Sequence, residues 1–98
     1  MVVTQKREEK HLVLTLEGRL DTTTAPQLED VLKSSLGGVT HLTLDLAKLV
    51  YVSSAGLRVI LGAQKQMAKL DGMVVKNVNE TVMDVFEVTG FKEILTLE

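Results

Sequence analysis

The spacing of apolar residues switches repeatedly between two patterns, and this switching limits the chain to a small set of folds. Apolar and polar residues alternate in "HLVLTLEG" (11–18) and "HLTLDL" (41–46), as in strands with one face on a core. "VVTQ" (2–5) predicts a hairpin with the first stretch through the charged turn 8–10. "MVVKNV" (73–78) predicts a buried strand.

A helical stripe follows the first alternating stretch, in residues 20–38. Thr24 and Gln27 have the spacing of a capping box, and Pro26 falls in the first turn, where a missing amide donor does little harm. The apolar residues of the stripe are Leu28, Val31, Leu32 and Leu36. The pair Gly37–Gly38 predicts the end of this helix.

Two more helices are predicted in the second half of the chain. From Ser54 the spacing becomes helical, and Asp71–Gly72 ends this helix. Its apolar face consists of Leu57, Ile60, Leu61, Met67 and Ala68. A shorter helix over 81–90 has an apolar face of Val82, Val85 and Phe86 and stops at Gly90. "EILTL" (93–97) closes the chain as a last strand.

The predicted order is β-β-α-β-α-β-α-β. Strands that alternate with helices of these lengths predict an α/β fold with a mixed, mostly parallel sheet flanked by helices. The 98 residues suit one domain over 1–98, since the chain shows no linker or internal repeat.

Composition excludes several function classes. A net charge of −2 and only three aromatic residues disfavour nucleic-acid binding. The absence of cysteine excludes disulfides and thiolate metal sites. No apolar run approaches the roughly 20 residues that span a bilayer, and "MVVTQKREEK" (1–10) lacks the hydrophobic region of a signal peptide. We therefore expect a cytoplasmic protein without a membrane partner.

Catalytic machinery is not expected. The serines lack the G-x-S-x-G context of a hydrolase, and no phosphate-cradling loop is present. His11 and His41 are interpreted as isolated surface residues at the starts of two strands. These observations predict a protein that is not an enzyme and that has neither a cofactor nor a metal site.

"YVSSAGLRVI" (51–60) places two serines where a strand changes to a helix. One serine serves as an N-cap, a role worth about 1 kcal/mol, and this interpretation leaves the other without a structural task. A phosphate is tolerated at a helix N-terminus, where unpaired amides and partial positive charge meet it. The second serine thus suits a modification that changes a partner surface without unfolding the domain.

A stripe of small or weakly polar residues follows the serines at helical spacing, on a side different from the apolar face. Its members are Ala55, Val59, Gly62 and Gln66. Gly62 costs about 1 kcal/mol relative to alanine in a helix interior. Either the close approach of a partner or close packing against the protein's own strands explains this cost.

Three segments, in this order and spacing, resemble the STAS domain family: "GRLDTTTA" (18–25), "LDLAKLVYVSSAGLRVILGAQK" (44–65) and "FEVTGFKEIL" (86–95). More narrowly, the chain is similar to stand-alone bacterial anti-sigma factor antagonists. The resemblance implies an anti-sigma factor as partner, usually a serine kinase with a histidine-kinase-like ATP-binding fold. It also implies inactivation by phosphorylation, reset by a metal-dependent serine phosphatase, and a monomer.

The family motif, aligned on Gly56, implies that Ser54 is the phosphate acceptor, with Ser53 as second choice. Ser53 occupies the position that is usually an aspartate in the family. Asp21 matches an acidic residue that commonly lies near the acceptor. The predicted partner-binding residues are Thr22, Ala55, Gly56, Arg58, Val59, Gly62 and Gln66. The alternative is a non-switching STAS subunit of a transport ATPase complex or a signalling scaffold.

Overall fold

Five strands form one mixed sheet in the order β1-β2-β3-β4-β5, in a computed structural model that describes residues 1–98. The elements are β1 (Val2–Glu8), β2 (His11–Leu20), α1 (Ala25–Ser35), β3 (His41–Val52), α2 (Ser54–Met67), β4 (Met73–Lys76), α3 (Glu80–Thr89), α4 (Phe91–Ile94) and β5 (Thr96–Leu97). β1 pairs antiparallel with β2, and all other neighbours are parallel. The predicted α/β fold, its hairpin and its largely parallel sheet are confirmed.

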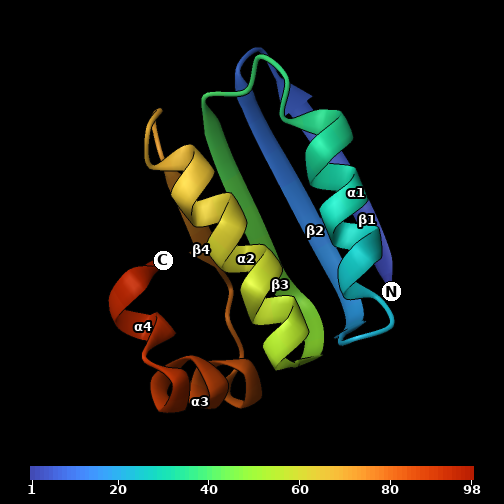
Figure 1. Ribbon diagram of the computed structural model, residues 1–98, viewed down its shortest axis with the longest axis vertical. Coiled ribbons are helices and arrows are strands. Elements are labelled where there is room, and N and C mark those ends of the chain that lie inside the picture. The colour runs from blue at the N-terminus through green and yellow to red at the C-terminus, as the bar shows by residue number, and fades with distance from the viewer.

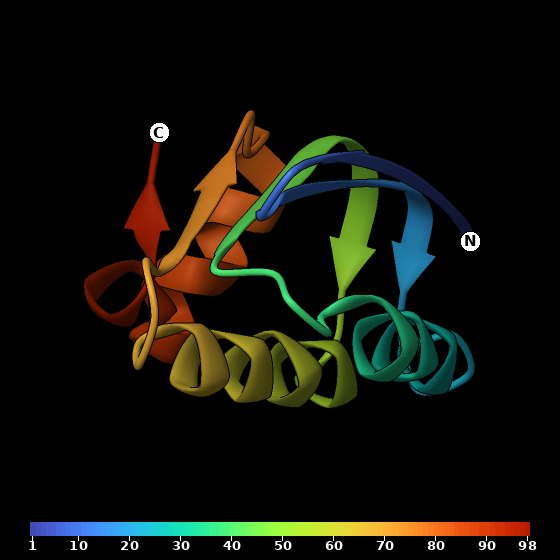
Figure 2. The ribbon, with the colours of Figure 1, turned by 90° about the horizontal axis from the view of Figure 1, so that it is seen from above.

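The helices lie mainly on one side of the sheet. α1 and α2 run side by side across one face, and the opposite face carries no helix (Figures 1 and 2). α3 lies beyond the ends of β3 and β4, at the end of the molecule where α2 begins (Figure 1). No helix of this chain has the length and apolar character needed to cross a membrane.

The core lies between the sheet and the two helices α1 and α2. The alternating leucines of β2 and β3 are fully buried on the covered face, namely Leu12, Leu14, Leu16, Leu42, Leu44 and Leu46. Leu28 and Leu32 of α1 meet them, as do Leu57, Ile60 and Ala63 of α2. Ala68 was predicted on the same face but is exposed, because α2 ends at Met67 and the chain turns there.

The C-terminal segment differs from the prediction. Residues 93 and 94, expected in a strand, belong to the one-turn helix α4, and β5 contains only two residues. Gly90 has φ +80°, a left-handed conformation that glycine adopts readily, and it turns the chain out of α3 directly into α4. The amide of Leu95 then donates to the carbonyl of Phe91 at 2.9 Å.

The sequence suggested that the two histidines are isolated, but in the structure they lie side by side. Residues 11 and 41 are register partners on the adjacent parallel strands β2 and β3. Their ring centres lie 4.5 Å apart, in an edge-on arrangement. β2 and β3 begin at these residues, at the end of the sheet opposite the start of α2. They are therefore neighbours on the uncovered face.

Candidate functional site

The two serines at the seam between β3 and α2 have different structural roles. Ser53 is the N-cap of α2, and its hydroxyl accepts a hydrogen bond from the amide of Gly56 at 3.4 Å. Its own amide donates to the carbonyl of Leu20 at the end of β2, at 2.9 Å. Ser54 is the first residue of α2 and is exposed. The cap is thus Ser53, and Ser54 is the serine left without a structural task.

Gly56 lets the first turn of α2 pack closely against the end of β2. It is buried, and a β-carbon at this position would lie 2.6 Å from Cγ and 3.0 Å from the carbonyl oxygen of Leu20. Leu20 is fully buried and cannot easily move away. Gly56, predicted among the partner-binding residues, is therefore a packing residue beneath the surface that carries Ser54.

Asp21 organises the loop next to the seam. Its carboxylate accepts hydrogen bonds from the amides of Thr23 and Thr24, at 3.0 and 3.2 Å. The predicted capping box is not formed. Thr24 has a helical conformation, and its hydroxyl donates to the carbonyl of Arg19 and accepts from the amide of Asp21. The side chain of Gln27 donates instead to the carbonyl of Met1.

These contacts define the electrostatics of the loop. The amides of Thr24 and Thr23 and the guanidinium of Arg19, 3.6 Å from the Asp21 carboxylate, hold the pKa of that carboxyl below its usual value. Arg19 also lies over the ring of Tyr51, 4.4 Å from its centre. Thr22, between the two ends of the loop, is exposed. The loop therefore presents a fixed carboxylate and an arginine at the end of the sheet where α2 begins.

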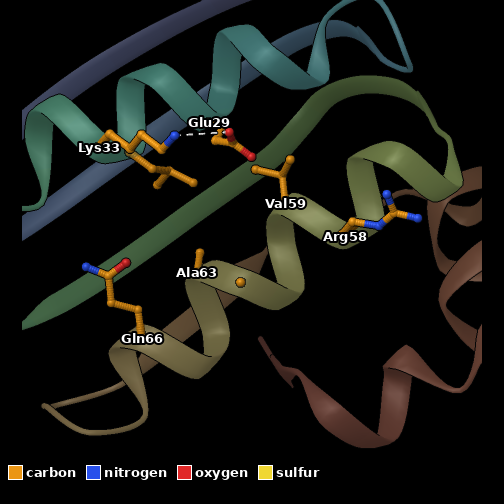
Figure 3. Close-up of a pocket in the computed structure, with 8 residues that line it drawn as sticks. Glu29, Lys33, Arg58, Val59, Ala63 and Gln66 are labelled. Atoms are coloured by element: carbon orange, nitrogen blue, oxygen red, sulfur yellow. Dashed lines mark hydrogen bonds and ion pairs between the residues drawn. The ribbon is translucent and has the colours of Figure 1, made fainter.

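The predicted stripe on α2 borders a groove between α1 and α2. Val59, Gly62 and Gln66 line it, together with Arg58 (Figure 3). The groove encloses about 320 Å³. Ala55 and Val59 are half-buried, and both pack against the core. Four of the predicted residues thus lie on the α2 side of the groove, where Ala63, which was not predicted, joins them, whereas the predicted Ala55 does not line it.

The α1 side of the groove was not predicted. Glu29 and Lys33 stand one turn apart on α1 and form an ion pair at 3.3 Å (Figure 3), and Leu32 also lines the groove. Their helical spacing was visible in the sequence, but only the packing of α1 beside α2 shows that they face the stripe. Any partner seated in the groove meets charges of both signs from α1.

Gly62 is exposed, and a β-carbon there would meet no atom within 4 Å. Of the two explanations for a glycine inside this helix, close packing against the protein's own strands is therefore wrong. The close approach of another molecule at Gly62 stays a prediction.

Comparison with known proteins decides the family. The family model described as STAS domain matches residues 2–98. The chain belongs to the STAS domain family. The BtrV protein of Bordetella bronchiseptica is 36% identical to this STAS domain over 96 residues, which cover 96% of this chain and 83% of BtrV. The anti-sigma-B factor antagonist of Bacillus subtilis is 28% identical over 93 residues, covering 94% and 85% of the two chains.

A solved structure supports the same fold. The STAS domain described here superimposes on the Bacillus cell fate determinant SpoIIAA in its phosphorylated form with a TM-score of 0.75 and 20% identity, over 99% of this chain and 91% of the other. In that protein, phosphorylation is compatible with the fold that this chain adopts.

Proposed function

We propose that this STAS domain is an anti-sigma factor antagonist that acts by binding and is switched off by phosphorylation of Ser54. Its partner is an anti-sigma factor that is also a serine kinase with a histidine-kinase-like ATP-binding fold. Binding releases a sigma factor or another output, and a metal-dependent serine phosphatase restores the binding form. Because the reaction needs ATP and its kinase, the proposed site of action is the cytoplasm, with the domain as a monomer.

The single observation that carries this proposal is that the two serines have different structural roles. Ser53 caps α2, and Ser54 is exposed, so Ser54 can accept a phosphate without loss of the cap. A phosphoserine carries about −1.5 to −2 charges, which are favourable at a helix N-terminus. The modification therefore leaves the domain folded.

The surroundings of Ser54 explain how the phosphate would act on a partner. Arg58 follows one turn later, is exposed, and forms no ion pair within the domain. Its guanidinium extends along α2 towards the first turn of the helix (Figure 3). Residues four apart on a helix are neighbours, so the dianion competes with a partner for this arginine. The modified surface thus gains negative charge and loses a free cation.

The partner surface is proposed to comprise Thr22, Ser54, Ala55 and the α2 side of the groove. The absence of a β-carbon at Gly62 lets another backbone or side chain approach α2 closely. Val59 and Gln66 offer apolar and polar contacts on either side of this position.

The test uses the purified kinase partner, ATP and three variants. Ser54→Ala should accept no phosphate and stay bound, and Ser54→Asp should bind weakly. Ser53→Ala is the matched control: it removes a neighbouring hydroxyl and should still be phosphorylated at position 54. Phosphate found at residue 53 in the native protein, or native-like binding by both Ser54 variants, would refute the switch.

The alternative is a non-switching STAS subunit of a transport ATPase complex or a scaffold. Ser53 favours it, because a serine stands where the family motif usually has an aspartate beside the acceptor. Isolation of the complexes from the host distinguishes the two functions: a kinase supports the antagonist, whereas an ATPase and a permease without a kinase support the alternative.

A further inference from the structure

The pair His11 and His41 lies on the uncovered face of the sheet, away from the seam. Leu12 and Leu42 point into the core, so the preceding residues of β2 and β3 point to the opposite side. The two rings are register partners, half-buried, with centres 4.5 Å apart and planes inclined at 64°.

We propose that His11 and His41 together bind one divalent transition-metal ion, such as Zn²⁺ or Cu²⁺. A metal–nitrogen distance of about 2.0–2.1 Å places the centres of two imidazoles on adjacent coordination positions roughly 4.5–5 Å apart. The observed separation of the ring centres, 4.5 Å, falls in this range, so rotation of the two side chains can bring one nitrogen of each ring to a common ion. Imidazole nitrogen is a preferred ligand of zinc, copper and nickel, and not of magnesium or calcium.

Thr43 provides the supporting contact that a metal-binding histidine usually has. Its hydroxyl lies 2.8 Å from Nε2 of His11, and Thr43 is only 5% exposed. When the Nε2–H group donates to this oxygen, Nδ1 of the ring carries the lone pair. Hydrogen bonding of the second ring nitrogen fixes the tautomer and the orientation of a metal-binding imidazole.

One face of His11 borders a shallow, open hollow on the surface. Glu8 of β1 is the register partner of His11, and both line a shallow hollow with Lys6 and Val13. Lys6 is 3.9 Å from Glu8. The chain holds no set of three or more histidine, cysteine, aspartate or glutamate residues placed to bind a metal. The ion therefore has two protein ligands, and water completes its coordination.

The test is a calorimetric titration of the untagged, chelator-treated protein with ZnCl₂, CuCl₂, NiCl₂ and MgCl₂. We expect one ion per chain, with Cu²⁺ bound more tightly than Ni²⁺ or Zn²⁺ and no binding of Mg²⁺. His11→Asn and His41→Asn should each weaken Zn²⁺ binding at least about tenfold, because the second imidazole binds intramolecularly. The double variant, which has no imidazole left at the site, should bind no Zn²⁺ at concentrations where the single variants still bind weakly.

Zn²⁺ affinity unchanged by either single substitution, or Zn²⁺ binding kept by the double variant, would overturn the proposal. A second readout needs no variant: the electron paramagnetic resonance spectrum of bound Cu²⁺ should show coupling to two imidazole nitrogens. A spectrum with a single nitrogen, or no bound Cu²⁺ at stoichiometric concentration, would contradict the paired site.

Discussion

A β-carbon on Gly56 would lie 2.6 Å from Cγ of Leu20, so the first turn of α2 rests directly on the last residue of β2. This contact fixes how closely the start of α2 approaches the sheet and thereby fixes the position of Ser54. Two predictions concern the glycines of α2, because Gly56 is enclosed and Gly62 is open.

Gly56→Ala should lower the free energy of unfolding by about 1–3 kcal/mol, because the added methyl group overpacks a rigid contact. Gly62→Ala is the matched control, with the same substitution at the other glycine of the same helix. It should raise the free energy of unfolding by roughly 0.5–1 kcal/mol, because the methyl group meets no atom and alanine favours the helix. Urea denaturation of both variants measures the difference, and equal effects would contradict the assigned packing.

Gly62→Ala should also weaken partner binding, although it stabilises the fold. A methyl group in the groove would hold the partner away from α2 and reduce contacts over Val59 and Gln66. Affinity for the anti-sigma factor, measured by calorimetry, should fall at least about tenfold, which corresponds to about 1.4 kcal/mol. Native affinity in this variant would place the partner elsewhere on the domain.

The serine assignment predicts opposite effects on stability and on switching. Ser53→Ala should lower the free energy of unfolding by about 1 kcal/mol, since the amide of Gly56 loses its acceptor. Ser54→Ala should change it by less than about 0.5 kcal/mol, because the exposed hydroxyl makes no hydrogen bond that the fold requires. The cap assignment fails if thermal melting shows the larger loss for Ser54→Ala.

Asp21 predicts a pH-dependent contribution to stability. Its pKa is lowered in the folded protein, chiefly by the amide of Thr24, so the ionised form is the one that the fold favours. The contribution is therefore fully present above the unfolded-state pKa of about 3.9 and is lost as the pH falls through the lower folded-state pKa. The stability difference between the native protein and Asp21→Asn should be constant near neutral pH and should shrink below about pH 4. If the stability difference between the native protein and Asp21→Asn grows as the pH falls, the direction assigned to the pKa of Asp21 is contradicted.

The strands and helices that have a regular apolar spacing were predicted correctly from the sequence. The alternating leucines of residues 12–16 and 42–46 identified two central strands and their buried face, and helical spacing from Ser54 identified α2. The capping box at Thr24 failed because the carboxylate of Asp21 binds the free amides of that turn instead.

Contacts between distant segments were not predictable in the same way. Only the parallel register of β2 and β3 brings His11 beside His41, and only the packing of α1 on α2 turns Glu29 and Lys33 towards the groove. The short helix α4 was missed because Gly90 both ends α3 and begins the next turn, whereas the apolar pattern after it suits a strand. The phosphate acceptor stays a prediction of the family motif, which the exposure of Ser54 supports.

The most direct test of the account compares the affinity of the anti-sigma factor for the unmodified domain and for the domain phosphorylated stoichiometrically at Ser54. A dianion held against the partner without a new cation costs several kcal/mol, so affinity should fall at least about a hundredfold while the melting temperature of the free domain stays level or rises. Equal affinities of the two forms, or unfolding of the phosphorylated domain, would contradict the central claim.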